Sequence, residues 1–195
     1  MTVAPRLLEM GTAAHISLLM ATVLLALPGA SLAADPEAER LAGDALALCT
    51  RADRLATDEQ PAVLERALSL AERARERDEH LARAHFAVFC SLGRLVELRG
   101  IGWHTLGSVA VVRESIERAA ALAPNDVDIL VGRGALLLRL PRLLGGDSTE
   151  AERCLRRALE LDPWHAGARQ YMTQLRGEPN VSRPEPVASA ALHAE

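Results

Sequence analysis

The chain has 195 residues, of which 3% are aromatic and 25% are charged, and its formal net charge is −4. This length suffices for one domain with a hydrophobic core, and the scarcity of aromatic residues favours helices over strands. The near balance of charge is not typical of a dedicated nucleic-acid binder or of a protein held at an anionic membrane surface.

The first 33 residues predict a secretory signal peptide. Arg6 lies near the start, an apolar run follows from Ile16 to Leu27, and Ser31-Leu32-Ala33 provides a small-residue cleavage site. The apolar run is shorter than the roughly 20 residues that a membrane-spanning helix needs. We therefore expect export with cleavage after Ala33, and an uncleaved N-terminal anchor is the alternative.

Two helices are predicted next. Asp35 and Pro36 are typical of a helix start, and the following residues to Leu55 repeat apolar side chains every three or four positions. Thr57 to Gln60 matches a capping box, which predicts the start of a second helix that ends at about Asp78.

An internal repeat is the strongest feature of the chain. Residues 67–74, 112–119 and 151–158 carry small or apolar side chains at the same offsets, four and then three positions apart. In the second and third copies a proline, Pro124 or Pro163, follows five positions after the last alanine. Two antiparallel helices cannot bury both of their faces alone, so such pairs are expected to stack on one another.

This pattern resembles the tetratricopeptide repeat (TPR), of the kind found in bacterial envelope proteins, over roughly Leu55 to Arg176. The residues of the last repeat that match the family signature are Gly134, Ala151, Leu155, Ala158 and Pro163. In the middle repeat, Phe89 lies where the family has a small residue. Close packing of the two helices is therefore in question at that point.

The resemblance implies an all-α fold in which antiparallel helix pairs stack as a short right-handed α-solenoid. About three TPR-like repeats are expected, capped by the helix from Pro36 and by a final helix from about His165 to Arg176. The helical repeat domain then spans residues 34–176. The breaker-rich stretch at 177–195 is predicted to be a disordered tail.

Both later repeats exceed the 34 residues of a standard TPR, and the excess lies between their two helices. The extra residues fall near Val96 to Leu106 and near Pro141 to Gly145. Equivalent loops of stacked repeats lie on one edge, which we call the loop rim. The residues predicted to contact a partner there, or else to seal their own helices, are Ile101, Trp103, Leu143 and Leu144.

The resemblance also implies a concave face, built from the first helix of each pair, that holds an extended peptide. The residues predicted to contact the partner there are Arg83, Phe86, Arg94, Asp128 and Arg139, with Cys90, Val131 and Leu138 on the same faces. The arginines can bind carboxylates of an acidic ligand or pair with nearby Glu and Asp side chains. The sequence leaves both possibilities open.

Three cysteines, Cys49, Cys90 and Cys154, lie far apart and predict small core residues rather than a disulfide framework. His80 and His85 lie five positions apart and so do not share a helix face. No catalytic residue, metal ligand or cofactor is predicted, and the chain is not expected to be an enzyme.

The predicted function is that of an exported, periplasmic scaffold or adaptor that binds a protein or peptide. No nucleic acid and, after signal cleavage, no membrane is expected as a partner. The sequence from Leu143 to Asp147 is also similar to the TPR component of periplasmic TRAP-type solute transporters. The alternative function is therefore an accessory of solute uptake, and an enzyme is the third.

Overall fold

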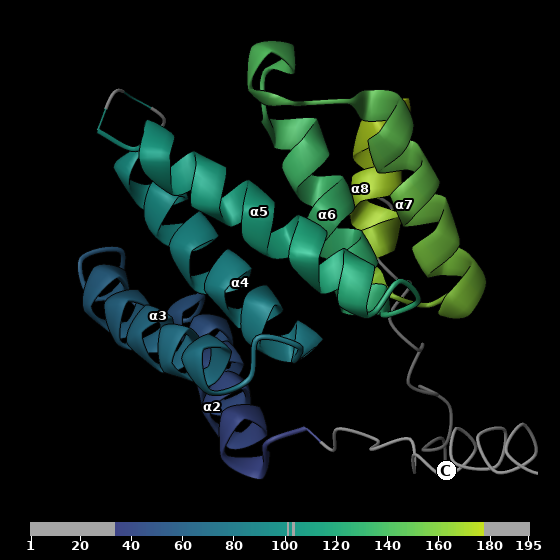
Figure 1. Ribbon diagram of the computed structural model, residues 1–195. Helices are drawn as coiled ribbons and strands as arrows, with labels where there is room; N and C mark the ends of the chain where they lie inside the picture. Colours follow the sequence, from purple (N-terminus) through teal and green to yellow (C-terminus); the bar gives the residue numbers. More distant parts are fainter. Residues whose placement is uncertain (1–33, 101, 103, 178–195) are drawn as a thin grey trace, which may run out of the picture. The chain divides into compact units, whose positions relative to one another are not determined.

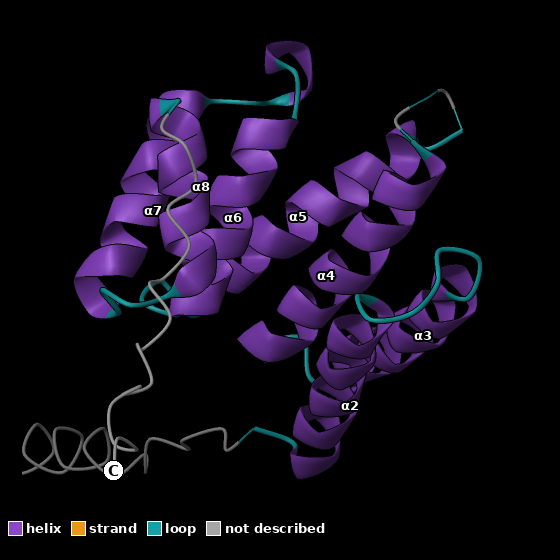
Figure 2. Ribbon diagram, turned by 180° about the vertical axis from the view of Figure 1, so that it is seen from behind, coloured by secondary structure: helices purple, strands orange, loops and turns teal. Residues whose placement is uncertain are grey.

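The computed structural model describes residues 34–100, 102 and 104–177, and within these it contains helices, turns and loops but no strand (Figures 1 and 2). The predicted signal peptide, Ile101, Trp103 and residues 178–195 lie outside the described part, so predictions about them are not tested. The elements are α2 (Pro36–Ala52), α3 (Gln60–Arg77), α4 (Ala82–Arg99), α5 (Leu106–Leu122), α6 (Val127–Arg139), the short 3-10 helix η1 (Arg142–Leu144), α7 (Ser148–Leu161) and α8 (Ala166–Arg176).

Consecutive helices form antiparallel pairs, α2 with α3, α4 with α5 and α6 with α7, and α8 packs on α7 and α6 (Figure 1). The pairs are joined because α4 packs on both α2 and α3, and α5 packs on α6. The described residues thus form an all-α, TPR-like stack of helix pairs. None of these helices combines the length and the apolar character required to cross a membrane.

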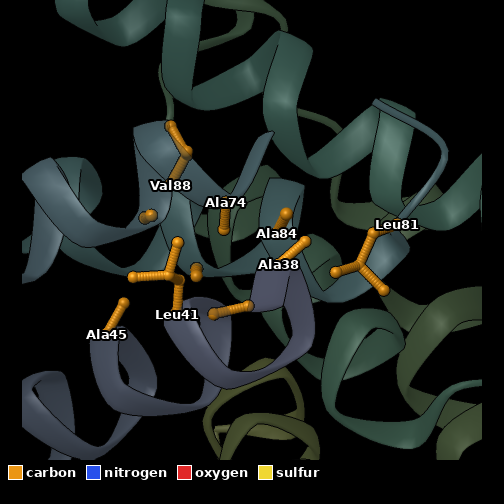
Figure 3. Packing of buried hydrophobic residues seen from close by; sticks show 10 residues of the cluster. Ala38, Leu41, Ala45, Ala74, Leu81, Ala84 and Val88 are labelled. Atoms are coloured by element: carbon orange, nitrogen blue, oxygen red, sulfur yellow. The ribbon is translucent and has the colours of Figure 1, made fainter. Parts of the chain in front are cut away.

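Small residues at the repeat positions allow the helices to approach closely. All the aligned positions of the three repeats are buried, namely Ala67, Ala71, Ala74, Val112, Ile116, Ala119, Ala151, Leu155 and Ala158. Figure 3 shows the first interface, where Ala38 and Leu41 of α2 meet Ala74 of α3 and Ala84 of α4. The sequence repeat therefore marks the interior of the stack.

Aspartates cap three of the helices. The Asp35 carboxylate accepts hydrogen bonds from the backbone N–H groups of Glu37 and Ala38 at 2.8 and 3.3 Å. Asp126 caps α6 in the same way, and Asp147 caps α7. The helix start predicted at Asp35 and Pro36 is confirmed.

The capping box predicted at Thr57 is wrong. Helix α3 begins at Gln60 without any side-chain cap, and the Gln60 side chain donates instead to the backbone carbonyl of Leu55. The backbone N–H groups of Glu59 and Gln60 both donate to the carbonyl of Ala56. The chain therefore already turns before the helix starts, and the Thr57 hydroxyl has no free amide to cap.

The two later repeats pack differently at the position where the family has a small residue, because the last repeat has Gly134 there and the middle repeat has Phe89. A Cβ atom on Gly134 would lie 2.9 Å from Leu155 Cγ of α7, so only glycine permits this approach. Phe89 of α4 instead stacks on Phe86, with ring centroids 5.8 Å apart, and both rings reach Gly132 of α6. The aromatic pair therefore packs against α6, and α4 still packs closely on α5 despite Phe89.

The two long connections differ from each other. The first is shorter than the sequence suggests, because α4 continues to Arg99 and ends at Gly100, whose φ is +75°. In the second, α6 ends at Arg139 before Pro141, and Gly145 adopts a φ of +96° after η1. Pro141 thus follows the end of α6, and Gly145 forms the turn after η1.

An ion cluster joins α5, α6 and α7. The Arg133 guanidinium donates to both carboxylate oxygens of Glu117 at 3.0 and 3.1 Å and to Glu150 at 2.8 Å. Burial lowers the pKa of Arg133, but its hydrogen bonds and charge pairing with Glu117 and Glu150 raise that pKa overall. The side chains of Arg133 and Glu150 are only 24% and 22% exposed. This cluster fixes the last full helix pair against α5.

Candidate functional site

A groove of about 1230 Å³ runs along the face formed by α2, α4 and α6 and reaches Tyr171 of α8. Helices α2, α4 and α6 are the first members of their pairs, as expected for a concave face, and Val109 and Val112 of α5 also line the groove. The floor of the groove is formed by apolar side chains and the Cys90 thiol. The floor residues of α4 and α6 are Phe86, Phe89, Cys90, Val131, Ala135 and Leu136.

All five residues predicted for the concave face line this groove: Arg83, Phe86, Arg94, Asp128 and Arg139. Cys90 and Val131 do so as well. Leu138 does not line it but packs against the core between α6, α7 and α8, because α8 covers that part of α6. The geometry brings the predicted residues together, and their role in binding a partner stays a prediction.

One border of the groove carries a row of polar contacts that we call the polar ladder. Arg94 of α4 pairs with Asp53 at the end of α2, and its Nε atom lies 3.5 Å from Glu97 Oε2. Arg139 of α6 pairs with Glu97 and donates to the Tyr171 hydroxyl at 3.0 Å. The ladder therefore connects α2, α4, α6 and α8.

Polar pairs also lie toward the other end of these helices. Arg83 Nη1 is 4.0 Å from Glu39 Oε2, and His165 Nε2 is 3.0 Å from Asp128 Oδ1. Each of the three predicted arginines thus has a carboxylate partner in the same chain. Of the two possibilities that the sequence left open, the structure shows the arginines paired with neighbouring acids.

Two thiols lie in the groove but are not activated. Cys49 Sγ is 3.2 Å from the Ser91 hydroxyl, which itself donates to the Ala87 carbonyl at 2.8 Å. Burial raises the pKa of the Cys49 thiol and raises that of the Cys90 thiol further. Neutral thiols are poor nucleophiles, so neither side chain is suited to covalent chemistry.

The histidines of α4 and the turn before it do not form a site. His85 is buried, its Nε2 atom lies 2.8 Å from the Glu79 carbonyl, and burial lowers its pKa. His80 is exposed beside the Glu79 carboxylate. Among the described residues, no group of three or more His, Cys, Asp or Glu side chains is arranged to hold a metal ion.

The loop rim is described only in part. Leu143 is 98% exposed, whereas Leu144 packs on the cluster formed by Val96, Val109, Val112 and Leu140. Leu144 therefore seals its own helices, and Leu143 is free for a contact. Ile101 and Trp103 lie outside the described residues.

Sequence reasoning missed several residues around the groove. Asp53 and Glu97 were not predicted although they complete the polar ladder, and Tyr171 was treated only as part of a capping helix. Trp164, in the turn between α7 and α8, is 77% exposed, with the Arg169 guanidinium 5.5 Å from its ring centre. A proline-tryptophan pair in a repeat turn is the signal that might have been followed at Trp164.

No protein-family model matches the chain, and no curated protein matches it. Among solved structures, the chain is similar to the first TPR of Spaghetti (RPAP3) bound to the HSP90 peptide SRMEEVD. The two are 19% identical, the match covers 70% of this chain and 93% of that chain, and the TM-score is 0.47.

Proposed function

We propose that the chain is a non-catalytic scaffold or adaptor of the bacterial envelope that holds a peptide or protein segment in the groove. The observation that carries the proposal is the groove itself, which is lined by five helices and combines an apolar floor with polar borders. Its volume of about 1230 Å³ exceeds the roughly 300–1,000 Å³ that is usual for small-molecule sites. An extended chain segment suits that space better than a single small solute, which disfavours the solute-uptake alternative.

The proposal assigns no chemistry to the groove. Its arginines are paired with carboxylates, and its two thiols are held neutral by burial. The proposed location is the periplasm, because the sequence predicts export and cleavage after Ala33. Leu143 of the loop rim, with Ile101 and Trp103, is proposed as a second contact surface for the same partner.

A random peptide library displayed on phage, selected against the full chain, tests this function. Thr50→Trp and Gly93→Trp each place an indole in the groove, since both residues line it and neither has a large side chain. Ser69→Trp places the same side chain on an exposed position of α3 outside the groove. Circular dichroism melting curves establish that each variant folds.

We expect selected peptides to bind wild type and Ser69→Trp alike in titration calorimetry, and to lose about tenfold or more in affinity, or 1.4 kcal/mol, in both groove variants. Failure to select any peptide would contradict the proposal. So would selected peptides that bind the folded groove variants as tightly as wild type.

A further inference from the structure

We infer that the groove selects an uncharged segment with apolar side chains and discriminates against acidic ligands. This inference rests on the proposed function and names the chemistry of its ligand. It differs from the expectation that an arginine-lined face binds carboxylates.

The charged groups that line the groove balance one another. They are Arg83, Arg94, Arg139, Asp53, Glu97 and Asp128, which makes three cations and three anions. A ligand with acidic side chains would therefore meet no net positive charge. It would also approach three fixed carboxylates, and like charges placed together disfavour a complex.

The arginines are also already engaged. Arg94 has two carboxylate partners, Asp53 and Glu97, and Arg139 has Glu97 and the Tyr171 hydroxyl, with the Tyr171 ring centre 5.7 Å from its guanidinium carbon. The Arg94 and Arg139 side chains are 36% and 52% exposed, so each pair is individually weak. A ligand carboxylate that displaced one of these partners would exchange one ion pair for another and leave an unpaired acid behind.

The floor of the groove provides apolar surface that a ligand can cover. Phe86, Phe89 and Cys90 are only half-buried, so part of their apolar surface faces the groove. Covering such surface with an apolar side chain removes it from water and is favourable. This gain does not require the polar ladder to open.

Between α4 and α6 the groove also reaches α5, the second helix of the middle pair. The residues that line this part, all apolar and from three helices, are Gly93, Val96, Val109, Val112 and Leu140. A Cβ atom on Gly93 would meet only Val112 Cγ1, at 3.7 Å, so the absence of a side chain there leaves space above α5. An aliphatic side chain of the ligand fits this position.

Three acetylated and amidated 12-residue peptides test the inference on the full chain by titration calorimetry. The first repeats Leu-Ser-Gln, the second replaces each Ser with Asp, and the third replaces each Leu with Ser. Each is measured at 50 and 500 mM NaCl. We expect the first peptide to bind about tenfold or more tightly than the other two and to change less than about threefold between the two salt concentrations, because screening acts on charge pairs.

A variant that gains affinity for the acidic peptide tests the inference without ambiguity from misfolding, because a misfolded protein would lose affinity rather than gain it. Glu97→Gln together with Asp53→Asn leaves Arg94 and Arg139 without their carboxylate partners and makes the groove net positive. We expect this double variant to bind the acidic peptide about tenfold or more tightly than wild type does. Tighter binding of the acidic peptide by wild type, weakened by salt, would overturn the inference.

If none of the three peptides binds, the groove-dependent peptides from the phage library take their place. A predominance of acidic sequences among them overturns the inference but keeps the proposed function, whereas a predominance of uncharged apolar sequences supports both. Recovery of no groove-dependent peptide overturns the proposed function as well.

Discussion

Single small residues decide how closely the helices of a pair approach, and Gly134 is the clearest case. The position a Cβ atom would take on Gly134 is 2.9 Å from Leu155 Cγ and 3.3 Å from the Ala151 carbonyl oxygen. On Gly43, in the middle of α2, the nearest such contact is 3.7 Å away, at the end of the flexible Arg83 side chain. Both glycines lie in the first helix of a pair, but only Gly43 has room for a side chain.

We expect Gly134→Val to lower the free energy of unfolding by about 1–3 kcal/mol, since overpacking forces α6 and α7 apart. Gly43→Val serves as the matched control and should stay within about 0.5 kcal/mol of wild type. Urea denaturation followed by circular dichroism measures both. Equal effects of the two substitutions would show that close packing at Gly134 is not needed.

The reactivity of the Cys90 thiol tests a second property of a single residue. Its raised pKa, caused mainly by burial, predicts that it is protonated and unreactive at neutral pH. In a Cys49→Ser, Cys154→Ser variant we expect native Cys90 to react with iodoacetamide at pH 7.5 about tenfold or more slowly than the same chain in guanidinium chloride. Mass spectrometry over time measures this, and equal rates would contradict the neutral state of this half-buried thiol.

At the level of whole helices, aspartate caps set the start of α2, α6 and α7. The pKa of Asp147 is lowered, first by the backbone N–H groups of Glu150 and Thr149. A carboxyl whose pKa is lower in the folded state stabilises the fold above its unfolded pKa, and this stabilisation is lost as the pH falls through the folded pKa.

We therefore expect wild type to lose thermal stability as the pH falls below about 4, in part through Asp147. Asp147→Asn retains a capping oxygen but no titratable group. Its melting temperature should be close to that of wild type at pH 7 and should fall less steeply between pH 5 and pH 3. Parallel curves for the two proteins would exclude a contribution from the Asp147 charge.

Neighbouring residues in the sequence predict some features of the helices correctly and others wrongly. Asp35 followed by Pro36 predicts a helix start correctly, because cap and helix lie within one turn of the chain. Thr57 resembles a cap equally well, yet the hydrogen bonds of the preceding turn at Ala56 leave it nothing to cap. Leu138 has the spacing of a groove residue, but α8 covers it.

In the molecule as a whole, α2 closes one end of the stack. Its residues Leu41, Ala42 and Ala45 are buried against α3 and α4, and Leu81, Ala84 and Val88 of the neighbouring repeat share the same core (Figure 3). The face that α2 covers is therefore apolar.

Deletion of residues 36–55 should expose this core and cause aggregation, because a stack needs a polar cap at its end. Size-exclusion chromatography and thermal melting measure the outcome. Removal of residues 178–195, the predicted tail, is the control and should leave a soluble chain that melts cooperatively. A deletion of 36–55 that behaved in the same way would show that α2 is not a cap.

The sequence by itself determined the helix pairs, since the repeated small and apolar residues at 67–74, 112–119 and 151–158 are local patterns that report which faces must be buried. It also placed Arg83, Arg94 and Arg139 on one face. Only the tertiary structure decided how those arginines are neutralised. Asp53 at the end of α2 pairs with Arg94 of α4, and Arg139 of α6 contacts Glu97 of α4 and Tyr171 of α8. No periodicity within one helix encodes such pairings between helices. The groove is likewise a tertiary result, because its lining residues come from helices that lie far apart in the sequence, from α2 to α8.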